Sequence, residues 1–155
     1  ILLRYKRNGS FCRYSRFGER SFTEVSDHNL IIFFDGVCGL CNRWVDFVFR
    51  IDSTGKIKVS PLQGELAKTK LQPDQLSDLS TIVFCKKDKR FTRSTAILEI
   101  LREVGGIWSL SVIFYLFPRL LRDWIYDLIA SNRYKLFGKR ESCRLPTPEE
   151  KERFV

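Results

Sequence analysis

The sequence has no methionine, one histidine (His28) and no long apolar run. Its longest apolar stretch, Ile107 to Phe117, is interrupted by two serines and is shorter than the ~20 residues that a membrane-spanning helix needs. We therefore expect no transmembrane segment. His28 stands in a polar stretch, which disfavours catalysis by a cysteine–histidine pair. No glycine-rich loop that would bind phosphate is present.

A metal centre with four protein ligands also lacks its usual residues. Zinc and iron–sulfur sites commonly use two paired cysteine motifs or several histidines. This sequence has one Cys-x-x-Cys and one histidine. Cys85 and Cys143 would complete a ligand set only through a coincidence of tertiary structure, so we expect no metal and no bound cofactor.

Only two of the five cysteines are close in sequence; the five are Cys12, Cys38, Cys41, Cys85 and Cys143. A disulfide-rich secreted domain typically has an even number, so the pattern indicates a reducing or organellar compartment. The first eighteen residues are rich in arginine and lack acidic residues, as the end of an organellar targeting segment does. We expect an organellar, specifically mitochondrial, location. The same residues are equally compatible with an arbitrary chain boundary. In that case the alternative location is the cytoplasm.

The formal net charge is +9, and much of it lies near the N-terminus. Residues 1–29 predict a basic arm without apolar periodicity, in which aromatic and basic side chains alternate. Such an arm is either a solvated surface or a contact for an acidic partner, namely RNA, an anionic lipid surface or a protein complex. Its candidate contact residues are Arg4, Lys6, Arg7, Arg13 and Arg16. A second basic cluster leaves the same two choices open; it comprises Arg133, Lys135, Lys139, Arg140 and Arg144.

The most informative stretch joins an apolar run, Leu30–Phe34, to two cysteines through Asp35 and Gly36. The run predicts a buried strand, and apolar residues at helical spacing after Cys41 predict a helix over about 39–52. Cys38 then lies at the helix N-terminus, where free N–H groups and the helix dipole stabilise a thiolate. Because this setting lowers a cysteine pKa, the motif predicts thiol–disulfide exchange, with a pair of unreactive cysteines as the alternative.

The rest of the chain alternates strands and helices. The patterns predict strands over 56–59, 81–85 and 90–93, helices over 65–71 and 94–104, and two further helices, one within 108–117 and one from Pro118. The predicted class is α/β: a thioredoxin-like domain over residues 30–145, with a central four-stranded mixed sheet, flanking helices and extra C-terminal helices. Residues 146–155 form a tail that begins a short helix.

Three segments carry a resemblance to a known family. Residues 35–41 are Asp-Gly-Val-Cys-Gly-Leu-Cys, residues 94–96 are Ser-Thr-Ala, and a block from Tyr126 to Gly138 is followed by Cys143. Together they resemble the Asp-x-x-Cys-x-x-Cys signature and the later blocks of the DCC family (DUF393) of predicted thiol–disulfide oxidoreductases. The resemblance spans residues 29–143 and implies a thioredoxin-like fold that acts on protein disulfides or dithiols.

The resemblance and the motif together assign roles to individual residues. Cys38, which is nearer the helix start and expected to be more exposed, is the attacking thiolate, and Cys41 is the resolving thiol. Asp35 either accepts a proton from Cys41 or orders the turn. Cys143, in a basic loop, is a third redox thiol or a simple loop cysteine, while Cys85 is a buried structural residue.

One position departs from ordinary thioredoxins, which place a cis-proline immediately before the third strand, facing the cysteine pair. Leu79 and Ser80 stand at that position here, and the nearest prolines are Pro73 and Pro61. We therefore do not expect the substrate backbone to be recognised by the usual route.

Two functions from different classes fit these observations. The first is a thiol–disulfide oxidoreductase that uses Cys38 and Cys41. The second is a structural or accessory subunit of a larger organellar ribonucleoprotein or membrane complex, anchored by the basic arm. A redox fold recruited as a structural part would satisfy both.

Overall fold

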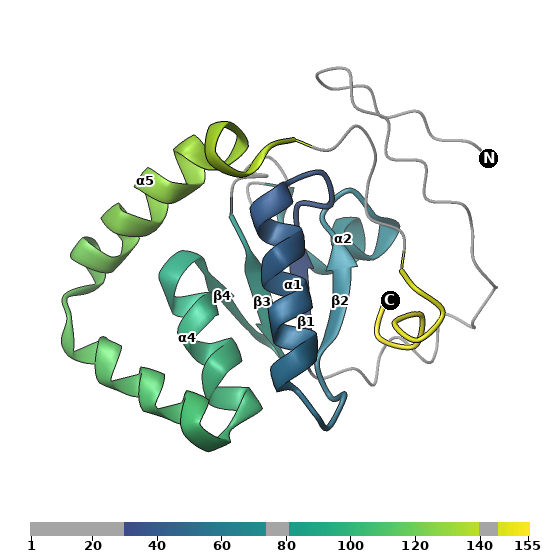
Figure 1. The fold of residues 1–155 in the computed structure, drawn as a ribbon, viewed down its shortest axis with the longest axis horizontal. Coiled ribbons are helices and arrows are strands. Elements are labelled where there is room, and N and C mark those ends of the chain that lie inside the picture. The colour runs from purple at the N-terminus through teal and green to yellow at the C-terminus, as the bar shows by residue number, and fades with distance from the viewer. Residues whose placement is uncertain (1–29, 74–80, 140–145) are drawn as a thin grey trace.

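The structure, a computed structural model, describes residues 30–73, 81–139 and 146–155. The basic arm, Cys12 and Cys143 lie outside these ranges. The helices and strands follow one another along the chain (Figure 1) as β1 (Leu30–Phe34), α1 (Gly39–Ile51), β2 (Lys58–Pro61), α2 (Glu65–Lys70), β3 (Val83–Lys86), β4 (Lys89–Thr92), α4 (Arg93–Val104), the 3-10 helix η2 (Gly106–Leu116) and α5 (Arg119–Phe137).

One four-stranded mixed sheet with strand order β2-β1-β3-β4 forms the centre of the fold. β1 pairs in parallel with β2, Ile32 opposite Val59, and antiparallel with β3, Ile32 opposite Phe84. β3 and β4 form an antiparallel hairpin. This arrangement confirms the predicted thioredoxin-like α/β class.

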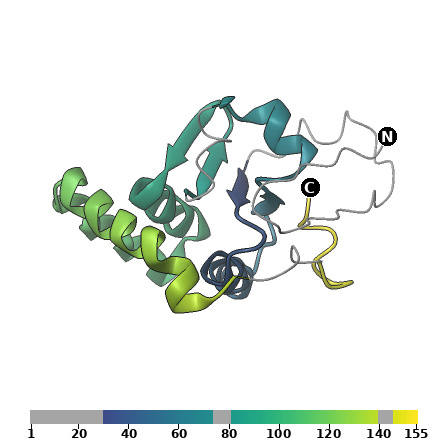
Figure 2. The same cartoon turned by 90° about the horizontal axis from the view of Figure 1, so that it is seen from above.

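Alternating side chains of β1 fill two hydrophobic clusters on opposite faces of the sheet, as the two-residue period of a strand requires. Ile32 and Phe34 belong to the cluster that includes residues of α1 and α4. Ile31 and Phe33 belong to the cluster against α2. Figure 2 shows α1 and α2 on opposite sides of the sheet. Both faces of β1 are thus buried, which explains its uninterrupted apolar sequence.

The C-terminal helices form an arc beside α4 (Figure 1). Gly105 and Gly106 adopt φ values of +80° and +61°, and they end α4 as glycine does at helix C-termini. The helix expected within 108–117 is a 3-10 helix, η2, and α5 follows after Pro118. Within the described ranges, none of the helices is both long and apolar enough to span a membrane.

The tail differs from its prediction, because turns replace the expected short helix. Val59 of β2 donates its N–H to the carbonyl of Arg153 at 2.8 Å and accepts one from Val155 at 3.0 Å. The Phe154 ring packs edge-on against Phe34 and Phe49, with centroids 6.3 and 6.1 Å apart. The tail therefore covers the free edge of β2 and completes the core beneath α1, which local sequence pattern does not predict.

The second strand begins at Lys58 rather than Lys56, because Asp52 holds the loop after α1. Its carboxylate accepts the Ile57 N–H at 3.0 Å and the Thr54 hydroxyl at 2.7 Å. Asp52 also forms a largely buried ion pair with Arg153. Burial raises the pKa of Asp52, but these hydrogen bonds and the charge of Arg153 outweigh it, so its pKa lies below the ordinary value.

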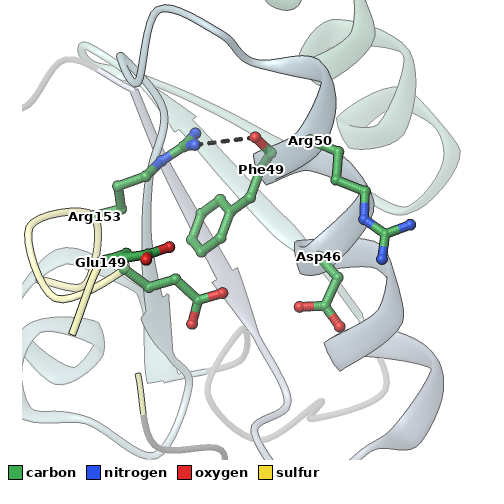
Figure 3. A pocket seen from close by; sticks show the side chains of 6 residues that line it. Asp46, Phe49, Arg50, Glu149 and Arg153 are labelled. Atoms are coloured by element: carbon green, nitrogen blue, oxygen red, sulfur yellow. Dashed lines mark hydrogen bonds between the residues drawn. The ribbon is translucent and has the colours of Figure 1, made fainter. Parts of the chain in front are cut away.

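Arg153 connects the tail to α1 and to the loop after it. Its guanidinium lies over the Phe49 ring, 4.1 Å from the centroid, and donates to the Phe49 carbonyl at 3.3 Å (Figure 3). It also donates to the Ile57 carbonyl at 3.3 Å. One side chain thus fixes three segments of the chain.

Replacing Arg153 by alanine should leave the Asp52 carboxylate buried without its cation. We expect a loss of about 3 kcal/mol in the free energy of unfolding at neutral pH, measured by urea denaturation. Because a lowered carboxyl pKa stabilises the fold above the unfolded-state value, the loss should shrink as the pH falls through the pKa of Asp52. Arg50→Ala, on exposed surface of α1, is the control, and a loss that does not vary with pH would contradict this account.

Candidate active site

The cysteine pair lies where β1 passes into α1. Cys38 is the N-cap of α1, with extended backbone angles, and its Sγ accepts the Cys41 N–H at 3.4 Å. The carbonyl of Cys38 accepts the Asn42 N–H at 3.1 Å, which starts the helix. A sulfur atom thus satisfies one of the backbone N–H groups that a helix N-terminus leaves unpaired.

Side chains from α1 and from the loop after β2 order the turn before the pair. Asp35 Oδ1 accepts the Val37 N–H at 3.2 Å and the Gln63 Nε2 at 2.8 Å. Gln63 in turn accepts the Gly36 N–H at 3.4 Å. Asn42 Nδ2 donates to the carbonyl of Gly36 at 3.0 Å and also to that of Cys38. Asp35 thus accepts hydrogen bonds within the turn, and its role in the reaction stays a prediction. Gln63 and Asn42 were not predicted.

The second oxygen of Asp35 binds two side chains of α5. Arg133 Nη2 donates to Asp35 Oδ2 at 3.1 Å, and the Tyr134 hydroxyl donates to the same atom. Asp35 and Arg133 are 1% and 3% exposed, so the ion pair is buried. The Arg133 guanidinium also lies 4.5 Å from the centroid of the Tyr134 ring. For Arg133, the expectation of a solvated or partner-facing cluster is wrong, because the residue faces the cysteine turn.

The electrostatic environment separates the two thiols. The hydrogen bond between the two cysteine side chains is the largest cause that lowers the pKa of Cys38, from 9.0 to about 6. Burial and the charge of Asp35 raise the pKa of Cys38 and so oppose this shift. The hydrogen bond from the Cys41 N–H and the charge of Arg133 lower it further. The same hydrogen bond, followed by burial, raises the pKa of Cys41. The arrangement supports one thiolate and one protonated thiol near neutral pH.

The expectation that Cys38 is the more exposed cysteine is wrong, since Cys38 is 0% and Cys41 5% exposed. The end of α5 covers Cys38: the Gly39 N–H donates to the Gly138 carbonyl at 3.3 Å, and Cys38 forms a β-bridge with Lys139. A Cβ atom on Gly39 would lie 2.2 Å from the Phe137 carbonyl oxygen. Glycine is therefore required inside the motif by this close backbone approach.

Cys41, by contrast, lines a small and largely apolar cavity of about 140 Å³. Leu40 and Trp44 of α1, Ile82 before β3 and Ile129 of α5 are among its walls, and Arg133 closes one part of it. The Ile82 N–H donates to the Tyr126 hydroxyl of α5 at 3.0 Å. Ile82 directly precedes β3; Leu79 and Ser80, predicted at the thioredoxin proline position, lie outside the described residues.

A second hollow, of about 370 Å³, lies between α1 and the tail (Figure 3). Its lining is charged and contains no cysteine; it comprises Asp46, Phe49, Arg50, Glu149, Glu150 and Arg153. Asp46 follows Cys38 by eight residues, or ~12 Å along a helix. This hollow is thus separate from the cysteine site.

The other predicted cysteines do not join the pair within the described part of the chain. Cys85 is buried in the cluster against α2, on the opposite face of the sheet, and burial raises its pKa. This placement confirms it as a buried core residue. Cys143, predicted as a third thiol, and the contact residues of the arm lie outside the described ranges. Across those ranges, no group of three histidine, cysteine or acidic residues could hold a metal ion.

Comparisons with known proteins identify the family of the chain. Residues 32–139 match the model of the DCC1-like thiol-disulfide oxidoreductase family. The uncharacterized protein YuxK of Bacillus subtilis is 40% identical over 129 residues, which cover 82% of this chain and 94% of that protein. A chloroplastic DCC family protein of Arabidopsis thaliana is 37% identical over 131 residues, or 81% of this chain and 74% of that protein. No solved structure matches the chain significantly.

Replacing Gly39 by alanine should displace the end of α5 from the cysteine pair. We expect the folded variant to react with iodoacetamide at Cys38 about tenfold faster or more, because local opening controls access to a buried thiol. Gly55→Ala is the matched control, since Gly55 has a φ of +65° with no atom within 4 Å of the added Cβ. A folded Gly39→Ala variant that is alkylated at the wild-type rate would refute the steric explanation.

Proposed function

Because the chain belongs to the DCC1-like thiol-disulfide oxidoreductase family, we propose that it exchanges electrons with protein disulfides or dithiols through Cys38 and Cys41. The observation that carries this proposal is the hydrogen bond from the Cys41 N–H to Cys38 Sγ at the N-terminus of α1. It stabilises a thiolate on one cysteine and leaves a protonated thiol one helical turn away.

The reaction proceeds in two displacements. The Cys38 thiolate attacks one sulfur of a substrate disulfide, forms a mixed disulfide, and releases the other sulfur as a thiolate that takes a proton from solvent. The Cys41 sulfur then attacks Cys38 Sγ, and its proton passes to the departing substrate thiolate. Two electrons have moved to the substrate, and the protein holds a Cys38–Cys41 disulfide. An external dithiol restores it, and the reverse sequence oxidises a substrate dithiol.

Asp35 acts in this scheme as a positioning residue. Its two oxygens accept hydrogen bonds from Val37, Gln63, Arg133 and Tyr134. These bonds fit the predicted role in ordering the turn better than the alternative role of proton acceptor for Cys41. Burial, followed by the bond to Asp35, raises the pKa of Tyr134 to about 12, which keeps this hydroxyl a donor.

Access to Cys38 requires a local movement, since the residue is fully buried, and the segment Phe137–Lys139, which pairs with Cys38 and lies against Gly39, is the candidate to move. Gly138, with φ of +74°, stands where the chain leaves α5 and supplies a conformation that other residues rarely adopt. We propose that a substrate displaces this segment and reaches Cys38 from that side.

We also infer an organellar location. The acid-free, arginine-rich first eighteen residues support it, as does the relative described as chloroplastic. The mitochondrion remains a prediction. So does the second function, an accessory subunit anchored by the basic arm, and deletion of residues 1–28 followed by co-purification from the source organelle tests it.

Exchanging each cysteine for serine separates the two chemical roles. Cys38→Ser should lower the rate of reaction with glutathione disulfide by about 100-fold or more, because the nucleophile is lost. Cys41→Ser should instead accumulate a mixed disulfide with glutathione at Cys38, detected by peptide mass mapping. Cys85→Ala is the matched control and should react as the wild type does. If Cys38→Ser retains full reactivity, the proposed function is wrong.

Substitutions in the buried ion pair should shift the pKa of Cys38 in opposite directions. Arg133→Gln should raise the pKa of Cys38 above about 6, because a favourable charge is removed. Asp35→Asn should lower it, because an unfavourable charge is removed. Ultraviolet thiolate absorbance as a function of pH measures both, on variants shown by circular dichroism to be folded. Arg50→Gln serves as the control, and shifts of the same sign in both variants would contradict the assignment.

A further inference from the structure

The 3-10 helix η2 carries no charged residue, and none of its eleven residues is buried. A helix that is apolar on all sides is normally enclosed by protein or lipid. Every large apolar side chain recorded as exposed in the described residues lies between Ile107 and Phe137, that is, on η2, α5 and the turn between them. Exposed apolar residues are usually scattered over a surface, so their concentration in one segment calls for an explanation.

The most exposed side chains of η2 form one straight row. Residues three apart are aligned in a 3-10 helix, which places Ile107, Leu110, Ile113 and Leu116 above one another. They are 75%, 70%, 68% and 86% exposed. At ~2 Å per residue this aliphatic ridge is about 18 Å long. None of its four side chains has a hydrogen-bonding group.

Aromatic side chains hold η2 against the domain, so that the ridge is displayed by a packed element. Trp108 packs edge-on against Phe47 of α1, with centroids 5.1 Å apart. The Tyr115 hydroxyl donates to Glu99 of α4 at 2.9 Å, and Arg122 of α5 lies 5.0 Å from the Tyr115 ring centroid. Trp108 and Tyr115 therefore attach η2 to the domain, whereas the side chains of the aliphatic ridge remain exposed.

The apolar surface continues onto α5. Leu120, Trp124 and Leu128 recur every four residues and so share one side of the helix. They are all exposed. Figure 1 shows η2 and α5 as one arc at the side of the molecule. We call the ridge and this stripe the apolar face. All seven of its side chains are large, apolar and exposed, and such a concentration marks an interaction surface.

We propose that the apolar face inserts into the interfacial region of an anionic lipid bilayer. The aliphatic ridge would enter the acyl-chain boundary, and Trp124, which is 63% exposed, would lie at headgroup depth, where tryptophan is enriched. The hydrocarbon region of a bilayer has no hydrogen-bonding groups, and the four side chains of the ridge have none either. A protein–protein interface, by contrast, typically includes about one hydrogen bond per 100–200 Å² of buried area.

The charges around the apolar face are compatible with an anionic surface. The acidic side chains of α4 and α5 each lie in an ion pair with lysine or arginine; the pairs are Glu99–Arg102, Glu103–Lys86, Asp123–Arg119 and Asp127–Arg93. Repulsion from these carboxylates is thereby reduced. Residues 93–139, which contain α4, η2 and α5, hold seven basic and four acidic residues, and this net charge of +3 attracts the face to anionic headgroups over a Debye length.

Vesicle flotation of the full chain tests the proposal. Wild-type protein should float with phosphatidylcholine vesicles that contain phosphatidylserine, less with phosphatidylcholine alone, and less as salt increases. The environment of Trp124 should become less polar on binding, which shifts its fluorescence to shorter wavelength. The double variant Ile113→Glu, Leu116→Glu should lose binding at least tenfold. The matched control, Ser53→Glu with Thr69→Glu, adds the same charge at exposed positions off the apolar face and should retain binding after allowance for its lower net charge.

A second variant, Ile107→Glu with Leu110→Glu, targets the other half of the same row and guards against one variant that fails to fold. Absence of wild-type flotation, or flotation that both ridge variants retain, overturns the proposal. A wild-type dimer in sedimentation that the ridge variants convert to monomer also overturns it, because a second copy then covers the face. Reaction with glutathione disulfide should be unchanged in the ridge variants, so this proposal and the proposed function fail independently.

Discussion

The buried ion pair between Asp35 and Arg133 is the interaction on which the site depends. Two charges lie in a region almost without solvent, so each needs the other and further hydrogen bonds to be tolerated. Asp35 follows β1 and Arg133 lies in the last turns of α5, which brings the C-terminal helix onto the turn that precedes the cysteines. The cover over Cys38 and the wall of the Cys41 cavity both follow from that placement of α5.

The same pair balances the thiol chemistry. Arginine near the sulfurs favours a thiolate and aspartate opposes it, so the two charges of the pair offset one another in part. The hydrogen bonds that Cys38 accepts from the side chain and from the N–H of Cys41 then favour ionisation of Cys38 over Cys41. A site built in this way favours a thiolate without a histidine, and the only histidine of the sequence precedes β1.

The sequence was sufficient to predict those features that depend on residues close together along the chain. The apolar run of β1, the Asp-Gly turn and the cysteine at the start of α1 are local patterns, and the order of elements led to the right fold class. Arg133 could not be placed in the site, because 98 residues separate it from Asp35 and a basic cluster looks the same whether its members are solvated or buried. The burial of Cys38 and the docking of Phe154 were missed for the same reason: each results from a segment distant in sequence. Gly39 inside the motif is the local feature that fits such a close neighbour, but its meaning depends on the position of Phe137 in the fold.

The position of Arg133 has a consequence for synthesis. The ribosome releases the strand and helix that carry the cysteines before it releases α5, whose Arg133 follows Asp35 by 98 residues. Long-range contacts form after local ones. During that interval the nascent chain has the Cys-x-x-Cys turn without its buried cation and without the cover over Cys38. The thiols of the unfinished protein are therefore open to any oxidant, and their final selectivity is acquired only when the last long helix docks.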